Sequence, residues 1–516
     1  MPLKAVRTVC ALLLATASAT AQFPIGGGSA TPMPQFSCTQ PWLGRPDFTM
    51  QLTGVLGGST GFICLSGAPG ASNVLGLPIF IDLEAVLAPP ILFTADGPPG
   101  VPGAGSWSMT LPLTFLGPDA AGVSIFGQAA IDDMSMPGGF VVSTGLEVSV
   151  TLMPQVFGAT VAAGTAAQYA FLNGVTLAPD HPSVPEPLAS NLVGAVYADG
   201  GSRLYVAAGN SINVADLTGP APVWSTFFGV AAFMAGDGAG VAYDRSRKII
   251  WTVAIPAGSS QVELIGLNAD TASAGYGMVL HQTTGFGAFV GNGTTPIGPW
   301  SLRSDGRRLA ILDGTPKTLH VYDLDPASPT FLSPLNSILA PGVGGIFPTY
   351  AGAKFSRNGA EVLVIRTPIF GSTEIARFSL AAGQFIDHNP LAPGIQSIGP
   401  NSLPSVVIPA STNDLSPLPN GDILLCGSGG LGFTAKLLIG QGPLPSLSLL
   451  ASPTPTPAAT RIAADIDGGR CVVGALQFGT TPTVFVFETA TMTLELAQPI
   501  APASFTSNAV KSLAWR

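Results

Sequence analysis

The sequence predicts an all-β protein, in which an N-terminal β-sandwich of jelly-roll type precedes a six- or seven-bladed β-propeller. Three observations support this: frequent turn residues, period-two alternation in the first third, and a recurring unit of short strands thereafter. The 516 residues include 64 glycines and 48 prolines, about a fifth of the chain; this composition disfavours long helices. Hydrophobic residues reach 47%, so the chain can bury a large core and is not disordered.

The first 21 residues have the order of a secretory signal peptide. Lys4 and Arg7 provide a basic start, and the residues from Thr8 to Ala17 are mostly apolar. Ala19-Thr20-Ala21 offers small residues at the cleavage positions. The apolar stretch is too short for a stable bilayer anchor. We therefore expect an exported protein, periplasmic, cell-surface or extracellular, whose mature chain has no integral membrane segment.

Charge divides the chain into two regions. No Lys or Arg occurs from Pro46 to Ser202, and residues 22–188 carry ten acidic residues and one basic residue, Arg45. The remainder is nearly balanced, with 19 acidic and 17 basic residues, and this asymmetry supports a domain boundary. The expected domains are a signal peptide at 1–21, an N-terminal extension at 22–45, a β-sandwich at 46–177, a Pro-rich linker at 178–188 and a β-propeller at 189–516.

The sandwich prediction rests on clean alternation of apolar and polar residues. Phe48, Met50 and Leu52 alternate with threonines and a glutamine, and the same period recurs at 106–113 and 146–152. A period of two places one face of a strand inward and the other outward. Further strands are expected near 61–66, 78–84, 91–94, 122–130 and 139–143.

The propeller prediction rests on a recurring unit of an apolar strand, a tight turn and two further strands. Turns such as Asp199-Gly200 and Asn420-Gly421 match the twist of a hairpin. The turns lie at 199, 244, 305, 358, 420 and 467, and such spacings indicate four-stranded blades with insertions. The segment Ala509 to Trp515 repeats only the opening strand, which suggests ring closure. If residues 168–177 pair with it, the ring has seven blades; otherwise it has six.

Four cysteines follow the expected cleavage point, an even number that suggests disulfides in an exported protein. Cys38 and Cys64 are the better pair because they flank the same strand region, and that bridge would stabilise by about 3 kcal/mol. Cys426 and Cys471 lie on corresponding strands of adjacent repeats. They either pair or serve as small buried residues.

Propeller ligands usually bind at one axial end, on the loops that lead into the inner strands. Four candidates lie about seven or eight positions before a turn (Asn191, Asp237, Tyr350 and Asn413), and three more lie close by (Asp414, Trp300 and Arg461). Carboxylates, an Arg and aromatic rings there could bind a sugar or a cation. The alternative, which the sequence favours, is that they cap loops and bond backbone groups.

Metal, histidine and nucleic-acid chemistry receive little support. No two of the four histidines have metal-ligand spacing, so neither a metal site nor a histidine base is expected. Asp132-Asp133 offers oxygens that suit Ca²⁺, but one pair supplies too few ligands. We expect no cofactor, with Ca²⁺ as the open alternative. The net charge of −9 and pI of about 4.8 argue against nucleic acid as a partner.

Two resemblances accompany these patterns. Tyr197 to Gly219 and Arg303 to Pro326 are similar to the YVTN or lactonase-like propeller repeats of secreted bacterial proteins. Leu65-Ser66-Gly67-Ala68-Pro69-Gly70 and Ser143-Thr144-Gly145-Leu146 belong to a stretch, roughly 60–152, that resembles a module of exported planctomycete proteins. The first resemblance implies a fold, because propellers host unrelated functions. The second implies secretion or surface placement and no reaction.

The sequence shows a fold signal without a catalytic constellation, and it leaves open whether the protein is an enzyme. We expect an exported noncatalytic propeller that binds a polymer or protein partner, either an unknown protein or a polysaccharide. The alternative is a lactonase-like hydrolase acting at the propeller axis through Asp237, Asp414 or Arg461. A third hypothesis gives the sandwich a carbohydrate-binding role with Trp107 as stacking platform, but Trp107 lies on an apolar stripe typical of a core.

Overall fold

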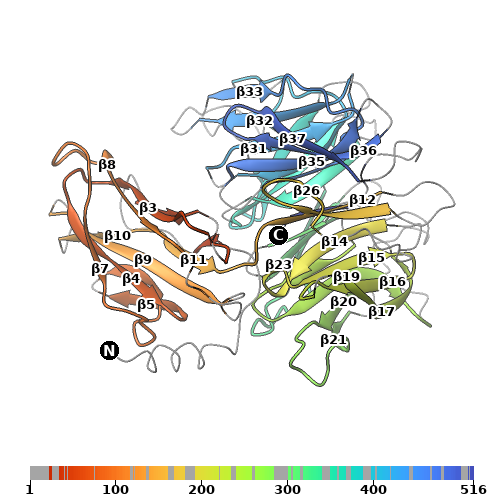
Figure 1. Cartoon of the computed structure of the whole chain (residues 1–516), viewed down its shortest axis with the longest axis horizontal. Helices are drawn as coiled ribbons and strands as arrows, with labels where there is room; N and C mark the ends of the chain where they lie inside the picture. The colour runs from red at the N-terminus through yellow and green to blue at the C-terminus, as the bar shows by residue number, and fades with distance from the viewer. Residues whose placement is uncertain are drawn as a thin grey trace. The chain divides into compact units, whose positions relative to one another are not determined.

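A computed structural model shows the arrangement of the chain (Figure 1). The described residues are 22–25, 34–180, 192–510 and 512–515, apart from internal gaps. The gaps are 40, 44, 75, 115, 117–119, 121–122, 135–138, 161–167, 220, 234–239, 259–261, 284–299, 304–305, 314–317, 340–348, 357–358, 368–372, 387–396, 401, 403, 419, 430, 441–445, 465–467, 478–480 and 501–509. The expected signal peptide at 1–21 and most of the Pro-rich linker lie outside them.

The described residues form antiparallel β-strands and no α-helix, which confirms the predicted fold class. We find among them no helix with the length and hydropathy needed to cross a bilayer. The chain divides into a first unit of residues 1–153 and a second unit of residues 154–198 and 202–515, with 199–201 and 516 grouped with the first. The boundary expected at 177 is therefore wrong, and it lies near Met153.

The first unit is a sandwich of a large and a small sheet joined by one apolar core. Strands expected in the sequence appear where the alternation predicts them. The large sheet has the path β1 (Gln22–Ile25), β11 (Gly145–Ser149), β9 (Ser124–Asp132), β4 (Thr60–Ser66) and β7 (Ile91–Thr94), with β10 (Phe140–Val142) also on β9. The small sheet is β2 (Gln35–Cys38), β3 (Phe48–Val55) and β8 (Gly105–Leu111), and β5 (Pro69–Val74) and β6 (Leu77–Ile81) form a separate hairpin.

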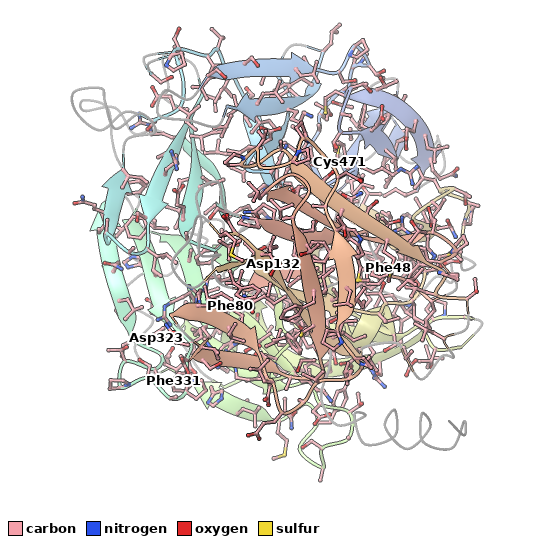
Figure 2. The ribbon with its side chains drawn as sticks, turned by 90° about the vertical axis from the view of Figure 1, so that its left-hand side faces the viewer. Phe48, Phe80, Asp132, Asp323, Phe331 and Cys471 are labelled. Carbon is pink, nitrogen blue, oxygen red and sulfur yellow. The ribbon has the colours of Figure 1, made fainter. Side chains whose placement is uncertain are left out.

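The sandwich core follows from the period of two. Phe48, which Figure 2 labels, begins β3, and Phe48, Met50 and Leu52 are all buried. They pack in one cluster with Ile63 of β4. The sheets approach closely at Gly127, where an added Cβ would come 2.7 Å from Cε1 of Phe36. The alternation therefore decides which face of each strand closes the core.

The second unit contains six consecutive β-meanders that form the blades of a propeller (Figure 1). Each runs from an inner to an outer strand, and each inner strand lies beside the next one around the ring. Blade 1 is β14 (Leu192–Ala198), β15 (Arg203–Ala208), β16 (Ser211–Asp216) and β17 (Val223–Phe233); blade 2 is β18 (Ala242–Asp244), β19 (Ile249–Pro256), β20 (Glu263–Asn268) and β21 (Val279–Gln282); blade 3 is β22 (Trp300–Leu302), β23 (Arg308–Asp313), β24 (Thr318–Asp323) and β25 (Pro334–Leu339). Blade 4 is β26 (Thr349–Phe355), β27 (Glu361–Thr367), β28 (Glu374–Ser379) and β29 (Gln384–Ile386); blade 5 is β30 (Thr412–Pro417), β31 (Ile423–Gly427), β32 (Phe433–Ile439) and β33 (Leu447–Ala451); blade 6 is β34 (Arg461–Ala464), β35 (Arg470–Gln477), β36 (Thr481–Glu488) and β37 (Thr493–Pro499).

A seventh blade joins distant parts of the sequence. Its inner strand is β38 (Ser512–Trp515), which pairs with β12 (Gln155–Thr160), and β12 pairs with β13 (Gln168–Asn173). Figure 1 shows β12, in orange, among the yellow and blue strands of the ring. β38 lies beside the inner strands of both blade 6 and blade 1. The ring therefore has seven blades, although the direct partner of the closing strand is β12 and not the expected segment 168–177, of which β13 pairs with β12 instead. Because β12 and β13 belong to the propeller, the expected sandwich extended too far along the chain.

The hairpin between the first two strands of a blade turns at the expected glycines. Gly306 and Gly359 have φ of 71° and 67°, a region that favours glycine. Neighbouring blades also contact these turns: a Cβ on Gly306 would come 2.4 Å from Cγ of Asp244, and one on Gly359 would come 2.9 Å from Cδ of Arg303. The turn glycines thus provide both the backbone conformation and the space that stacked blades require.

The predicted disulfides do not form among the four described cysteines. Cys38 is buried in the core from the small sheet, whereas Cys64 is on the large sheet next to core residue Ile63 and therefore points to the opposite face. Cys426 and Cys471 are fully buried in one cluster between blades 5 and 6. Their role as small buried residues, the second reading of the sequence, is the one that the structure supports.

Candidate functional site

The structure brings together three of the seven candidate residues at the start of the inner strands of blades 5 and 6. These are Asn413, Asp414 and Arg461. Asn191 and Asp237 lie outside the described residues. Trp300 begins β22 and Tyr350 is the second residue of β26, so both backbones start inner strands as expected, but their side chains lie outside the described part.

A β-bulge recurs at the start of three inner strands. The register shifts between Leu192 and Gly194 in β14, and between Tyr350 and Gly352 in β26. The third shift, between Thr412 and Asp414 in β30, leaves Asn413 as the extra residue. Bulges bend a strand and re-aim its side chains, and they are frequent beside active sites. The bulge in β30 sets the orientation of two neighbouring candidate residues.

The Asp414 carboxylate is buried between inner strands. Its Oδ1 accepts a hydrogen bond from the Leu415 amide at 2.9 Å, and its Oδ2 accepts one from the Ile462 amide of blade 6 at 3.2 Å. Gly352 of blade 4 is also close, since a Cβ atom added to this glycine would lie 3.9 Å from Oδ1 of Asp414. Only 7% of Asp414 is exposed. The carboxylate is therefore held by two amides beside the inner strands of three consecutive blades.

Asn413 and Arg461 complete the cluster from either side of the blade boundary. Nδ2 of Asn413 donates to the carbonyl of Ala459 at 2.7 Å, which fixes the segment that leads into β34. Nη1 of Arg461 donates to the carbonyl of Thr460 at 2.8 Å. Nε of Arg461 is buried without a hydrogen-bond partner, and no described carboxylate forms an ion pair with this guanidinium. The described residues thus leave a buried N–H of a half-buried cation without an acceptor, an arrangement that costs free energy.

The pKa of the Cys426 thiol depends on the charged residues around it. Burial raises its pKa well above the ordinary value, the Asp414 carboxylate raises it further, and the Arg461 guanidinium opposes the rise. Cys471 adds a smaller upward effect. Asp414 and Arg461 thus act on the same buried group from adjacent blades. With its pKa raised, Cys426 stays a neutral thiol and is not a nucleophile.

A second pair of charged residues, which the sequence reasoning missed, lies in blade 4. Arg366 of β27 stands opposite Glu374 of β28, and the guanidinium forms an ion pair with the carboxylate. The two residues are 5% and 7% exposed. Arg366 is also the register partner of Tyr350, which places the pair at the same end of its blade as the candidate residues. The sequence did contain a signal for this pair, because an Arg and a Glu lie on two consecutive strands of one predicted repeat.

Two described histidines lie on blade strands. The described part of the chain contains no group of three or more His, Cys, Asp and Glu residues that could hold a metal ion. His320 lies in β24, where burial lowers its pKa to about 4, and its Nδ1 hydrogen-bonds Oγ of Ser337 at 2.9 Å. His281 stacks on Trp251 in blade 2, and burial, with the charge of Arg247, lowers its pKa. Both rings therefore belong to blade packing.

The arrangement combines a held carboxylate with a guanidinium that has an unused N–H. A carboxylate can accept a proton from water. A guanidinium can donate to an oxygen on which negative charge develops. The chemistry that this pair suits is the attack of water on a carbonyl carbon.

No protein-family model and no curated protein matches the chain. Among solved structures, it is similar to a putative 6-phosphogluconolactonase from Bacteroides uniformis, with 14% identity over 70% of this chain and 99% of that chain and a TM-score of 0.48. A periplasmic gluconolactonase from Pseudomonas aeruginosa has 12% identity over 70% and 98% of the two chains, with a TM-score of 0.45. The β-propeller domain of Cps50 from Myceliophteria thermophila has 11% identity over 60% and 88%, with a TM-score of 0.36.

These likenesses concern the fold, and the names belong to the neighbours. They nevertheless correct the functional expectation drawn from the sequence. A noncatalytic propeller that binds a polymer or protein was expected first, whereas several neighbours are named as lactonases. The first expectation is therefore wrong on this finding, and its alternative, a lactonase-like hydrolase, is the better supported of the two.

Proposed function

We propose that the protein hydrolyses a lactone or a similar ester at the axial end of the propeller, between blades 5 and 6. The observation that carries this proposal is that the buried Asp414 carboxylate accepts the amide of Ile462, the residue after Arg461, so that a carboxylate and a half-buried guanidinium lie on adjacent inner strands. A role in loop capping alone leaves that half-buried cation unexplained. The names of the structural neighbours agree with the proposal and do not carry it.

In the proposed reaction, Asp414 accepts a proton from a water molecule, whose oxygen attacks the carbonyl carbon of the ring. Arg461 donates hydrogen bonds to the carbonyl oxygen while negative charge develops there. The bond between the carbonyl carbon and the ring oxygen then breaks. The leaving oxygen takes the proton back from Asp414, so one water and one lactone give one hydroxy acid.

Site-directed variants test these roles. Asp414→Asn should lower kcat for a panel of aldonolactones by about 10²–10⁴-fold, because an amide cannot serve as the base. Arg461→Ala should lower it by about 10²–10³-fold, the usual effect of removing one donor to an oxyanion. Hydrolysis would be followed by proton release in weakly buffered solution.

Matched controls separate chemistry from folding. Asp270→Asn and Arg307→Ala change the same residue types at positions where the side chains are 36% and 62% exposed, and both should retain full activity. Asp237→Asn should be tested in the same assays because the sequence analysis predicted Asp237 as a candidate site residue. If the unaltered chain hydrolyses no lactone or ester in the panel, or if both axial variants keep wild-type turnover, the proposal is refuted.

The remaining expectations are part of the same proposal. The basic, apolar and small residues at the start of the chain support export to the periplasm, the cell surface or the medium. The resemblance of residues 60–152 to a module of exported planctomycete proteins supports the same location. Ca²⁺ stays the open alternative among cofactors, and assays with calcium and with a chelator would test it.

A further inference from the structure

The outer face of the small sheet of the sandwich carries an ordered array of uncharged hydrogen-bonding side chains. Residues of β2, β3 and β8 that alternate with the core residues, together with Thr39 just after β2, form three rows across the sheet, and all are serine, threonine or glutamine. The rows, which we call the hydroxyl grid, are Gln35–Thr53–Ser106, Ser37–Gln51–Ser108 and Thr39–Thr49–Thr110. Most of these side chains are exposed, and the others are half-buried.

The grid is regular because the sheet fixes its spacing. Side chains on neighbouring strands lie about 4.8 Å apart, and successive rows lie about 6.8 Å apart along the strands. Oγ1 of Thr49 and Oγ1 of Thr110 are 2.9 Å apart and hydrogen-bonded across the strands. Serine and threonine lose little rotamer freedom when they are held. The Thr49–Thr110 pair is therefore ordered in advance, and holding the other serines and threonines costs a ligand little side-chain entropy.

Charge decides which partner the grid suits. None of its nine residues is charged, and residues 22–188 contain ten acidic residues and one basic residue. Arg45, the one basic residue, is already engaged by the carboxylate of Asp47 at 2.9 Å and by the ring of Trp42. Asp47 lies just before β3, and Asp96 bridges to Ser106 at the edge of the grid. An anionic polymer would be repelled and would find no cation to bind.

The large sheet gives a contrast within the same unit. Gln128 of β9 is 4% exposed, because its side chain bonds the amide of Phe80 and the carbonyl of Pro78 in the β5–β6 hairpin. Glu147 and Asp132 also lie on this sheet, so its outer side is partly covered and partly acidic. The hydroxyl grid is neutral and exposed. Trp107, the platform suggested by the sequence, instead packs against Phe93 from the core side.

We propose that the hydroxyl grid binds a neutral polysaccharide. Each side chain of the grid both donates and accepts hydrogen bonds, as the hydroxyls of a sugar polymer do. Each such bond is weak in water, contributing about 0.5–1.5 kcal/mol, so a repeating partner that meets several rows at once is favoured over a single sugar. This binding is separate from the hydrolysis proposed at the propeller axis.

The test is a pull-down of the full chain with insoluble polysaccharides. We expect retention on at least one of cellulose, chitin and cross-linked dextran, little change between 0.05 and 1 M salt, and no retention on calcium alginate beads. Gln51→Glu combined with Ser108→Asp places two carboxylates in the central row and should reduce the bound fraction at least about tenfold. Thr49→Val combined with Thr110→Val removes hydroxyls without adding charge and should reduce it severalfold.

A control variant adds the same charge elsewhere on the unit. Leu92→Glu combined with Met134→Glu alters side chains that belong to residues 79% and 91% exposed and lie outside the grid, and it should bind like the unaltered chain. All variants should keep the melting temperature and the turnover of a soluble lactone. Absence of retention on every neutral matrix, equal retention on alginate, or full retention of both grid variants would each overturn the proposal.

Discussion

The sandwich and the propeller use charge in opposite ways. In the described part of the sandwich the ion pair joins Arg45 to Asp47, two residues apart on one segment. In blades 1 to 4 of the propeller, ion pairs join residues in or next to the second and third strands, at the end where the hairpin between the first two strands turns. They are Arg203–Asp216 at 3.1 Å, Lys248–Asp270 at 3.0 Å, Arg377–Glu361 at 2.6 Å and the pair Arg308–Asp323.

The difference shows what stabilises each unit. The sandwich depends on its apolar core and its backbone ladders, which respond little to pH or salt. Blades 1 to 4 each have such a cross-strand ion pair, which contributes about 0.2–1 kcal/mol. Blade 4 also contains the buried pair Arg366–Glu374, whose loss of one partner should cost more. Calorimetry of the whole chain should resolve one transition for each unit, and changes to charge or ring closure should move the propeller transition alone.

Removal of β38 should have the largest effect. A chain that ends before Ser512 loses the inner strand of blade 7 and the cover that Ala514 gives to the core around Phe157. Four lost backbone pairings, at about 1 kcal/mol each, together with lost burial, should destabilise the ring by about 4 kcal/mol or more. Removal of Arg516 alone is the control. Equal melting temperatures of the two truncated chains would contradict ring closure by this strand.

Substitution within the buried pair of blade 4 should follow in size. Glu374→Gln leaves the Arg366 guanidinium buried without its counter-charge, which typically destabilises by about 3–5 kcal/mol. Replacing both residues, by Arg366→Met and Glu374→Leu, should restore most of the loss, because two apolar side chains need no partner. Urea unfolding monitored on the propeller transition would measure this. A double variant less stable than the single one would show that the pair has another role.

Acidification should give the smallest effect. Burial lowers the pKa of His320 from 6.5 to about 4, so below pH 6.5 the unfolded chain binds a proton that the folded chain does not. Stability is therefore full above pH 6.5 and declines as the pH falls towards 4. The propeller transition should fall by roughly 2–4 °C for each kcal/mol lost, and His320→Gln should flatten this dependence. An equal fall in the melting temperature of the sandwich transition would contradict the proposed difference between the two units.

At pH values below 4, Asp323 and Asp270 at the ends of their blades should also change the stability of the propeller. Burial raises the pKa of Asp323, but hydrogen bonds from Ser328 and Thr330 and the charge of Arg308 outweigh it and hold the pKa below 3.8. The hydrogen bond of Lys248 likewise lowers the pKa of Asp270. Both groups stabilise the folded ring above about pH 3.8, and this stabilisation is lost as the pH falls below that value. Figure 2 labels Asp323 near Phe331 at this end of blade 3.

The sequence by itself determined the features that depend on local pattern. The alternation around Phe48, Met50 and Leu52 predicted a sandwich strand and its buried face, because a period of two acts over a few residues. The turn glycines predicted the blades, because Gly306 and its equivalents need a backbone conformation that most residues avoid. The position of Asp414 and Arg461 before their turns also placed both near one axial end.

Tertiary structure alone decided what depends on distant pairing. The repeated segment at Ala509 to Trp515 indicated a closing strand, but only the ladder between β12 and β38 identified its partner, fixed the seventh blade and moved the domain boundary. The pairing of strands far apart in sequence depends on the tertiary structure and not on local pattern. Cys38 and Cys64 lie close in sequence, yet they belong to two sheets, and Cys38 points into the core whereas Cys64 points away from it, so the predicted bridge does not form. The hydroxyl grid appeared only once three strands were aligned, because register decides which side chains share a face.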